Sequence, residues 1–303
     1  MSVLCISLWT FGKECKLKKY LDALPDARCL GDLKDGSDDW HMIRSQGIGG
    51  SDIGTIVGLN PWESAYTLFH KRQGNIEDSV EENWSIRFGK AFEQPILDLY
   101  QEEHPDEEVF TTGTFVNEQH SWMHANPDAL AKVNGEWKII EVKTARAGWS
   151  ELPAHYEAQV MWYMKVTGIR KAVVVAVAGM TYNEYEVEYN EFAANLFQEK
   201  AEKFWESLKL DQPPNWDGAK STYETERKLH PEIEDRDADI PWELWSDLEL
   251  GLQNQAQVDA HVNKAKSRIL AHMGNARYGH VNGQRVVSRQ ARGKGAPYLV
   301  ITK

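Results

Sequence analysis

Cysteine is scarce in this sequence of 303 residues, and long apolar runs are missing. The three cysteines, Cys5, Cys15 and Cys29, have no CxxC spacing, which excludes a zinc or iron–sulfur site built on cysteine pairs. No run approaches the about 18 apolar residues that a membrane-spanning helix needs. The first residues also lack the basic region and cleavage site of a secretory signal. We therefore expect reduced thiols, no membrane partner and a cytoplasmic location.

Internal repeats and low-complexity tracts are also missing, which argues against solenoids and disordered tails. The hydrophobic content of 42% and the 12 tryptophans are enough for a sizeable core. The sequence therefore predicts one large globular domain with an extension.

Negative charge dominates, with a formal net charge of -12, but it is unevenly distributed. Residues 251–303 contain nine Lys or Arg and one acid, so the rest of the chain is strongly acidic. Between them, residues 231–250 hold eight acids and one Arg, with prolines nearby. These shifts predict an N-terminal extension (1–39), a core domain (40–210), an acidic linker that contains proline (211–250) and a basic C-terminal appendage (251–303).

Hydrophobic periodicity predicts an α/β core, with helices flanking a central mixed sheet. Ser51 and Asp52 are N-cap residue types before a short apolar helix, and helices are expected over 64–73, 86–104 and 191–208. The continuous apolar run 171–178 is typical of a buried strand.

The most informative stretch is HANPDALAKVNGEWKIIEVKTA, residues 124–145. Asn134-Gly135 predicts a two-residue hairpin turn, because both central residues need positive φ. With that register Asp128 lies opposite Glu141, and Lys143 falls on the same face. Two opposed carboxylates repel, so they form either a solvated surface cluster or a divalent-metal site.

These residues and three further motifs carry a family resemblance. Pro127-Asp128 followed by Glu141-Val142-Lys143 resembles the PD-(D/E)XK nuclease signature. Trp40, Arg44 and GIGGSDIG resemble the N-terminal motif of the YqaJ and lambda-exonuclease type of phage recombination nucleases. FGKAFEQPI with Glu93 resembles their helical acidic motif, and HYEAQVMWYM with Gln159 and Tyr163 resembles the helix after the catalytic hairpin.

The resemblance implies a restriction-endonuclease-like core and a magnesium-dependent exonuclease. Such an enzyme resects linear double-stranded DNA ends 5′ to 3′ and leaves a 3′ single strand for a single-strand annealing protein. It also implies two Mg²⁺ ions, which Mn²⁺ could replace, a homo-oligomer (a trimer by resemblance) and, for a phage-encoded protein, the host cytoplasm. The alternatives are a non-catalytic adaptor that binds DNA ends and a structure-specific endonuclease on the same fold.

Roles for individual residues follow from the same resemblance. Asp128 and Glu141 would ligate the metals with the backbone carbonyl of Val142, and Glu93 would complete the acidic site, in part through water. Lys143 would position or polarise the attacking water, and Gln159 would orient the water or the scissile phosphate.

The phosphate near the 5′ end would be held by Arg44 and Ser51. His124 is expected to be a hydrogen-bonded histidine at a strand end and not a ligand.

The basic C-terminal segment leaves two interpretations open. A helix that ends at Gly274, a hairpin at Asn282-Gly283 and a final strand are expected. Its arginines beside Tyr298 could grip DNA, or they could form a solubilising face that docks onto the acidic body.

Overall fold

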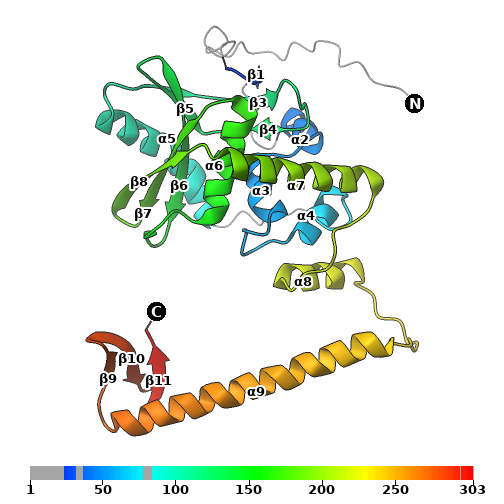
Figure 1. Ribbon diagram of the computed structural model, residues 1–303, viewed down its shortest axis with the longest axis vertical. Coiled ribbons are helices and arrows are strands. Elements are labelled where there is room, and N and C mark those ends of the chain that lie inside the picture. The colour runs from blue at the N-terminus through cyan, green and yellow to red at the C-terminus, as the bar shows by residue number, and fades with distance from the viewer. Residues whose placement is uncertain (1–23, 32–36, 78–83, 294, 303) are drawn as a thin grey trace. The chain divides into compact units, whose positions relative to one another are not determined.

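The computed structural model describes residues 24–31, 37–77, 84–293 and 295–302. The chain divides into two compact units, Met1–Glu232 and Ile233–Lys303 (Figure 1). Cys5, Cys15 and most of the predicted N-terminal extension lie outside the described residues, as does the side chain of Trp40.

The first unit contains eight strands and seven helices within its described residues. In chain order they are β1 (Ala27–Gly31), α2 (Asp38–Ser45), α3 (Gly50–Ile56), α4 (Ala65–Arg72), α5 (Trp84–Glu103), β2 (Glu108–Thr111), β3 (Thr114–Asn117), β4 (His124–Ala125), β5 (Ala129–Val133), β6 (Glu136–Ala145), α6 (Ala154–Thr167), β7 (Lys171–Ala178), β8 (Thr181–Glu188), α7 (Glu191–Leu210) and α8 (Lys220–Leu229).

The central sheet has five strands in the order β2-β5-β6-β7-β8. Only β6 and β7 are parallel, and the other neighbours are antiparallel. Helix α6 provides the crossover that a parallel pair requires. A smaller sheet has the order β1-β3-β4.

Strand β6 is buried on both faces of the sheet, and its alternation sorts its side chains between two hydrophobic clusters. Ile139 belongs to the cluster that includes Trp162 of α6. Ile140 and Val142 belong to the cluster on the other face, with Tyr100 of α5. The predicted α/β core, a mixed sheet between helices, is therefore confirmed (Figure 1).

The turn between β5 and β6 forms as predicted. Asn134 has φ 50° and Gly135 has φ 89°, the positive values that a type I′ turn requires. Val133 pairs with Glu136 and Ala129 with Ile140. The predicted register is therefore confirmed over the paired residues.

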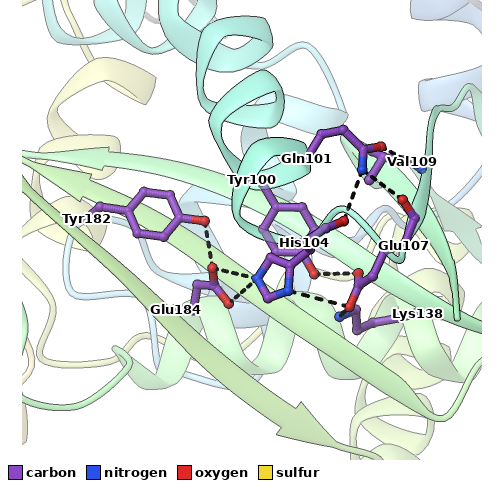
Figure 2. Close-up of polar contacts among 8 residues, drawn as sticks. All are labelled: Tyr100, Gln101, His104, Glu107, Val109, Lys138, Tyr182 and Glu184. Carbon is purple, nitrogen blue, oxygen red and sulfur yellow. Dashed lines mark hydrogen bonds and ion pairs between the residues drawn. The ribbon is translucent and has the colours of Figure 1, made fainter.

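A polar cluster fixes the end of α5 against the sheet (Figure 2). His104 Nε2 lies 2.9 and 3.0 Å from the two carboxylate oxygens of Glu184 in β8. Glu107 accepts hydrogen bonds from Tyr100 of α5 at 2.8 Å and from Lys138 of β6 at 2.5 Å. The cluster thus joins α5, β6 and β8, and it holds in place the helix that carries Glu93.

Two helix starts differ in how well the sequence predicts them. Ser64 caps α4 by accepting from the Thr67 N–H at 3.1 Å, as its residue type favours. The expected cap of α3 at Ser51 or Asp52 is wrong, because Gly49 is the N-cap. The Asp52 carboxylate accepts from the Gly49 N–H at 3.0 Å, and Ser51 lies inside the first turn.

The second unit consists of α9 (Trp242–Met273) and an antiparallel sheet of β9 (Tyr278–Val281), β10 (Gln284–Gln290) and β11 (Tyr298–Ile301). Gly274 ends α9, and Asn282-Gly283 forms the β9–β10 turn, so this predicted helix, hairpin and final strand are confirmed. The predicted domain boundaries stay predictions. The range 211–250 contains α8 and the first turns of α9 as well as extended chain.

No helix among the described residues is long and apolar enough to span a bilayer.

Candidate active site

The Asp128 and Glu141 carboxylates lie at the β5–β6 hairpin. Asp128 directly precedes β5, and its Oδ2 accepts a hydrogen bond from the Val142 N–H at 2.7 Å. Glu141 lies in the middle of β6 with 2% of its surface exposed. The hairpin thus brings the predicted pair of acids to one site, and the surface-cluster alternative fails because Glu141 is buried.

Glu141 is held by two donors from different elements. Its Oε1 accepts from Lys143 Nζ at 2.6 Å and from Gln159 Nε2 on α6 at 2.7 Å. Gln159 Nε2 also lies 2.8 Å from the hydroxyl oxygen of Tyr163, one turn further along α6. The predicted residues Lys143 and Gln159 therefore meet at one carboxylate oxygen, and Tyr163 contacts Gln159 beside them.

The second oxygen of Glu141 is different. Glu141 Oε2 is buried and has no hydrogen-bond partner among the described residues. An unpaired carboxylate oxygen that is removed from water is costly unless a ligand satisfies it.

Burial and the neighbouring carboxylate shift the titration of this pair. Burial, followed by repulsion from Asp128, raises the pKa of Glu141 to about 8. Burial also raises the pKa of Asp128, although Lys143 and the Val142 N–H oppose this. Burial alone would lower the pKa of Lys143, but attraction by Glu141 and Asp128 outweighs it and the pKa is raised. The ammonium is thus held in its charged form beside two acids that resist ionisation.

Glu93 lies on α5, outside the immediate group. Its side chain is exposed, and its charge makes the smallest of the named contributions to the raised pKa of Glu141. No group of three or more His, Cys, Asp or Glu side chains in the described part of the chain converges tightly enough to hold a metal ion. Backbone carbonyls or water would therefore have to complete a metal site on the Asp128–Glu141 pair.

Two glycines before and in α3 allow this helix to pack beside the acids. A Cβ on Gly50 would lie 2.3 Å from Tyr163 Cε1, and one on Gly47 would lie 2.4 Å from the carbonyl oxygen of Trp122. Only glycine fits such close approaches. The glycine-rich motif is therefore explained by packing, and it places Ser51 near the same tyrosine that contacts Gln159.

Arg44 and Ser51, the two residues expected to hold the phosphate, line the same pocket. Tyr163 of α6, which contacts Gln159 beside the Asp128–Glu141 pair, forms one part of the pocket lining. His124 of β4 and Asn126, in the loop after β4, form another part. The pocket is lined by Ile43, Arg44, Gly49, Gly50, Ser51, Thr114, His124, Asn126 and Tyr163.

Asp52 and Arg72 do not line the pocket but contact Arg44, which does, and sequence reasoning missed these contacts. Asp52 is 3% exposed and lies between Arg44 Nη2, at 3.4 Å, and the Arg72 guanidinium. Burial raises the pKa of Asp52, but the two arginines outweigh it and the pKa is lowered. Arg72 Nη1 also donates to the Arg44 carbonyl oxygen at 2.5 Å. Arg72 therefore holds Arg44 in place.

His124 has the ordinary role that was expected. It is buried at the end of a strand, and its Nε2 lies 3.0 Å from the Ser121 carbonyl oxygen, so this nitrogen carries the hydrogen. Burial lowers its pKa.

Comparison with known proteins identifies relatives of this chain. Residues 39–170 match the family described as the YqaJ-like viral recombinase domain. A Bacillus subtilis (strain 168) protein named "Uncharacterized protein YqaJ" is 26% identical over 258 residues, which is 80% of each chain. Protein D345L of African swine fever virus (strain Badajoz 1971 Vero-adapted) is 32% identical over 65 residues, 22% of this chain and 19% of its own.

Solved structures give weaker matches. An alkaline exonuclease (LHK-Exo) from Laribacter hongkongensis has a TM-score of 0.47 and 15% identity, covering 64% of this chain and 99% of its own. A phage-related exonuclease from Haemophilus somnus 129PT has a TM-score of 0.43 and 12% identity, covering 55% and 96% respectively.

Proposed function

Because residues 39–170 match the family described as the YqaJ-like viral recombinase domain, we propose that this protein is a metal-dependent deoxyribonuclease. Its substrate is linear double-stranded DNA, which it resects from the 5′ end to leave a 3′ single strand for an annealing protein. The direction of resection and the annealing partner are carried over from the family resemblance.

The observation that carries the proposal is the buried Glu141 carboxylate with one satisfied and one unsatisfied oxygen. Lys143 and Gln159 both contact Oε1, and Oε2 has no hydrogen-bond partner in the described part of the chain. Together with Asp128, this leaves hard oxygen donors where a divalent cation would remove the repulsion. The donor set has no His or Cys and so fits Mg²⁺, with Mn²⁺ as a substitute.

Bound divalent ions would lower the pKa of a coordinated water and neutralise charge on the phosphate. Asp128, Glu141 and the Val142 carbonyl are the groups that would hold them, with Glu93 acting through water. Lys143 is placed to stabilise the developing negative charge and to orient the attacking water. Gln159 keeps Glu141 Oε1 occupied, so that Oε2 faces the ligand.

The Arg44 pocket would receive a phosphate of the 5′ end. Arg44 supplies positive charge, Asp52 and Arg72 hold it in position, and Ser51 supplies a hydroxyl. Tyr163 lines the pocket and also contacts Gln159. The phosphate pocket and the acidic pair therefore share one wall, as cleavage close to an end requires.

Digestion of linear duplex DNA, labelled separately at its 5′ and 3′ ends, tests the proposal. We expect Mg²⁺-dependent release of 5′-terminal nucleotides, no release in EDTA, and an intact covalently closed circle. The variants Asp128→Asn, Glu141→Gln and Lys143→Ala should be inactive. Glu136→Gln and Lys171→Ala, which change exposed charges on β6 and β7, are the matched controls and should remain active.

Three other outcomes would change the assignment. Cut circles would indicate an endonuclease. Release of nucleotides from the 3′ end alone would show that the protein resects DNA in the 3′ to 5′ direction. DNA-end binding without cleavage by the wild type would indicate an adaptor.

A further inference from the structure

The 32-residue helix α9 exposes a stripe of apolar side chains along its length. None of its residues, all of which the structure describes, is buried. Positions at alternating spacings of four and three, the pattern of a two-stranded coiled coil, are apolar except at Gly251 and Gln255 near the middle of the helix. The stripe consists of Leu244, Leu248, Gly251, Gln255, Val258, Val262, Ala265 and Ile269.

The large members of this stripe are well exposed, from 39% for Val262 to 64% for Leu244. A helix of this length spans about 48 Å, and an isolated helix gains little stability without packing of its apolar face. The exposed leucine, valine and isoleucine side chains of this stripe form a surface for a partner.

Charge along α9 indicates what that partner is. The half from 242 to 257 has three acids and no Lys or Arg: Glu243, Asp247 and Glu249. The half from 258 to 273 has three bases, Lys264, Lys266 and Arg268, and one acid, Asp259. The helix dipole favours acids near the N-terminus and bases near the C-terminus, but only in the first and last turns. Asp247, Glu249, Lys264 and Lys266 lie further inside the helix, so the dipole does not explain their arrangement.

We propose that α9 pairs with α9 of a second copy of this chain as an antiparallel two-stranded coiled coil. A parallel pair would place like charges side by side, whereas an antiparallel pair places each acidic half beside a basic half. The alignment that opposes Leu248 to Ala265 also opposes Leu244 to Ile269 and Gly251 to Val262. Large side chains then meet small ones or fill the ends of the seam, and Gln255 lies opposite Val258 at its centre.

The same alignment brings together one pair of opposite charges whose reversal tests the antiparallel arrangement. Asp247 immediately precedes Leu248, and Arg268 lies three residues after Ala265, so both flank the seam on the same side. Asp247 of one copy therefore lies beside Arg268 of the other, and the two-fold symmetry of the pair makes this contact twice. Within one helix the two residues are 21 positions apart and cannot touch.

Sedimentation equilibrium of the full chain, over a range of concentrations in EDTA, tests the proposal without reference to nuclease activity. We expect a dimer for the wild type. Asp247→Arg and Arg268→Asp should each weaken association about tenfold, because each change turns two attractive charge pairs of the dimer into repulsive ones. The double variant restores opposite charges in both pairs and should restore association. Leu248→Asp should leave a monomer, with a helix content that is unchanged or lower because α9 loses its partner. Asp235→Lys, an equal charge change before α9 begins, is the matched control and should leave the dimer intact.

A wild type that remains monomeric would overturn the proposal. So would an oligomer whose association Leu248→Asp leaves unchanged, because the copies would then meet through another surface. A double variant as weak as either single variant would rule out the antiparallel alignment.

Discussion

Replacing Glu141 by Gln should stabilise the protein in the absence of divalent ions, although the same change should abolish activity. The side chain is 2% exposed and one of its oxygens is unpaired. Gln keeps the shape and an oxygen to accept from Lys143 and Gln159, and it removes the charge. The substitution therefore measures the free-energy cost of burying a charged carboxylate separately from the contribution that the packing of the side chain makes to stability.

The expected gain in the free energy of unfolding follows from the raised pKa of Glu141. Burial, and then Asp128, raise the pKa of Glu141 from 4.5 to about 8, so the folded state binds the proton more tightly than the unfolded chain does. This contribution to stability is fully present below pH 4.5 and is lost as the pH rises through about 8. By linkage the loss at pH 8 is on the order of 4 kcal/mol. Because Lys143 loses an ion-pair partner in the variant, we expect a net gain on the order of 2 kcal/mol.

Urea unfolding followed by circular dichroism, at pH 5 and pH 8, measures this difference. In EDTA the variant should exceed the wild type at pH 8 and match it more closely at pH 5. Mg²⁺ should stabilise the wild type at pH 8 and have little effect on the variant. Glu136→Gln, an exposed acid on the same strand, should show neither effect. A Glu141→Gln protein that is less stable than the wild type in EDTA at pH 8 would show that Lys143 and Gln159 fully satisfy the carboxylate.

Three further changes test the surroundings of the site. Gly50→Ala should cost about 1–3 kcal/mol of stability and reduce DNA cleavage, because its Cβ would lie 2.3 Å from Tyr163; an unchanged urea midpoint would contradict this. Arg72→Ala should raise the pKa of Asp52 and weaken binding of a 5′-phosphorylated duplex end more than of a 5′-hydroxyl end, measured by fluorescence anisotropy in EDTA. Equal losses for the two ends would exclude a phosphate role. His104→Ala should lower stability by about 1–2 kcal/mol, which hydrogen exchange would detect as faster exchange at the end of α5. Unchanged exchange there would mean that the polar cluster is not needed to hold the helix.

Local signals determined much of this protein. The Asn134-Gly135 turn was predictable because two positive φ values select those residue types, and it set the register that places Asp128 beside Glu141. Ser64 and Gly274 marked helix ends for similarly local reasons. The family resemblance also pointed to Lys143, Gln159, Arg44 and Ser51, whose side chains lie around the acidic pair and along the adjoining pocket.

Only the tertiary structure showed how those residues are held. The burial of Glu141, its unpaired oxygen and its raised pKa depend on α6 packing over β6. The Asp52–Arg72 contact joins α3 to α4, so nothing in the spacing of either helix reveals it. The same holds for Gly50, whose missing side chain matters because Tyr163, more than a hundred residues away, lies against it. Contacts between distant segments depend on packing geometry, which local residue preferences do not encode.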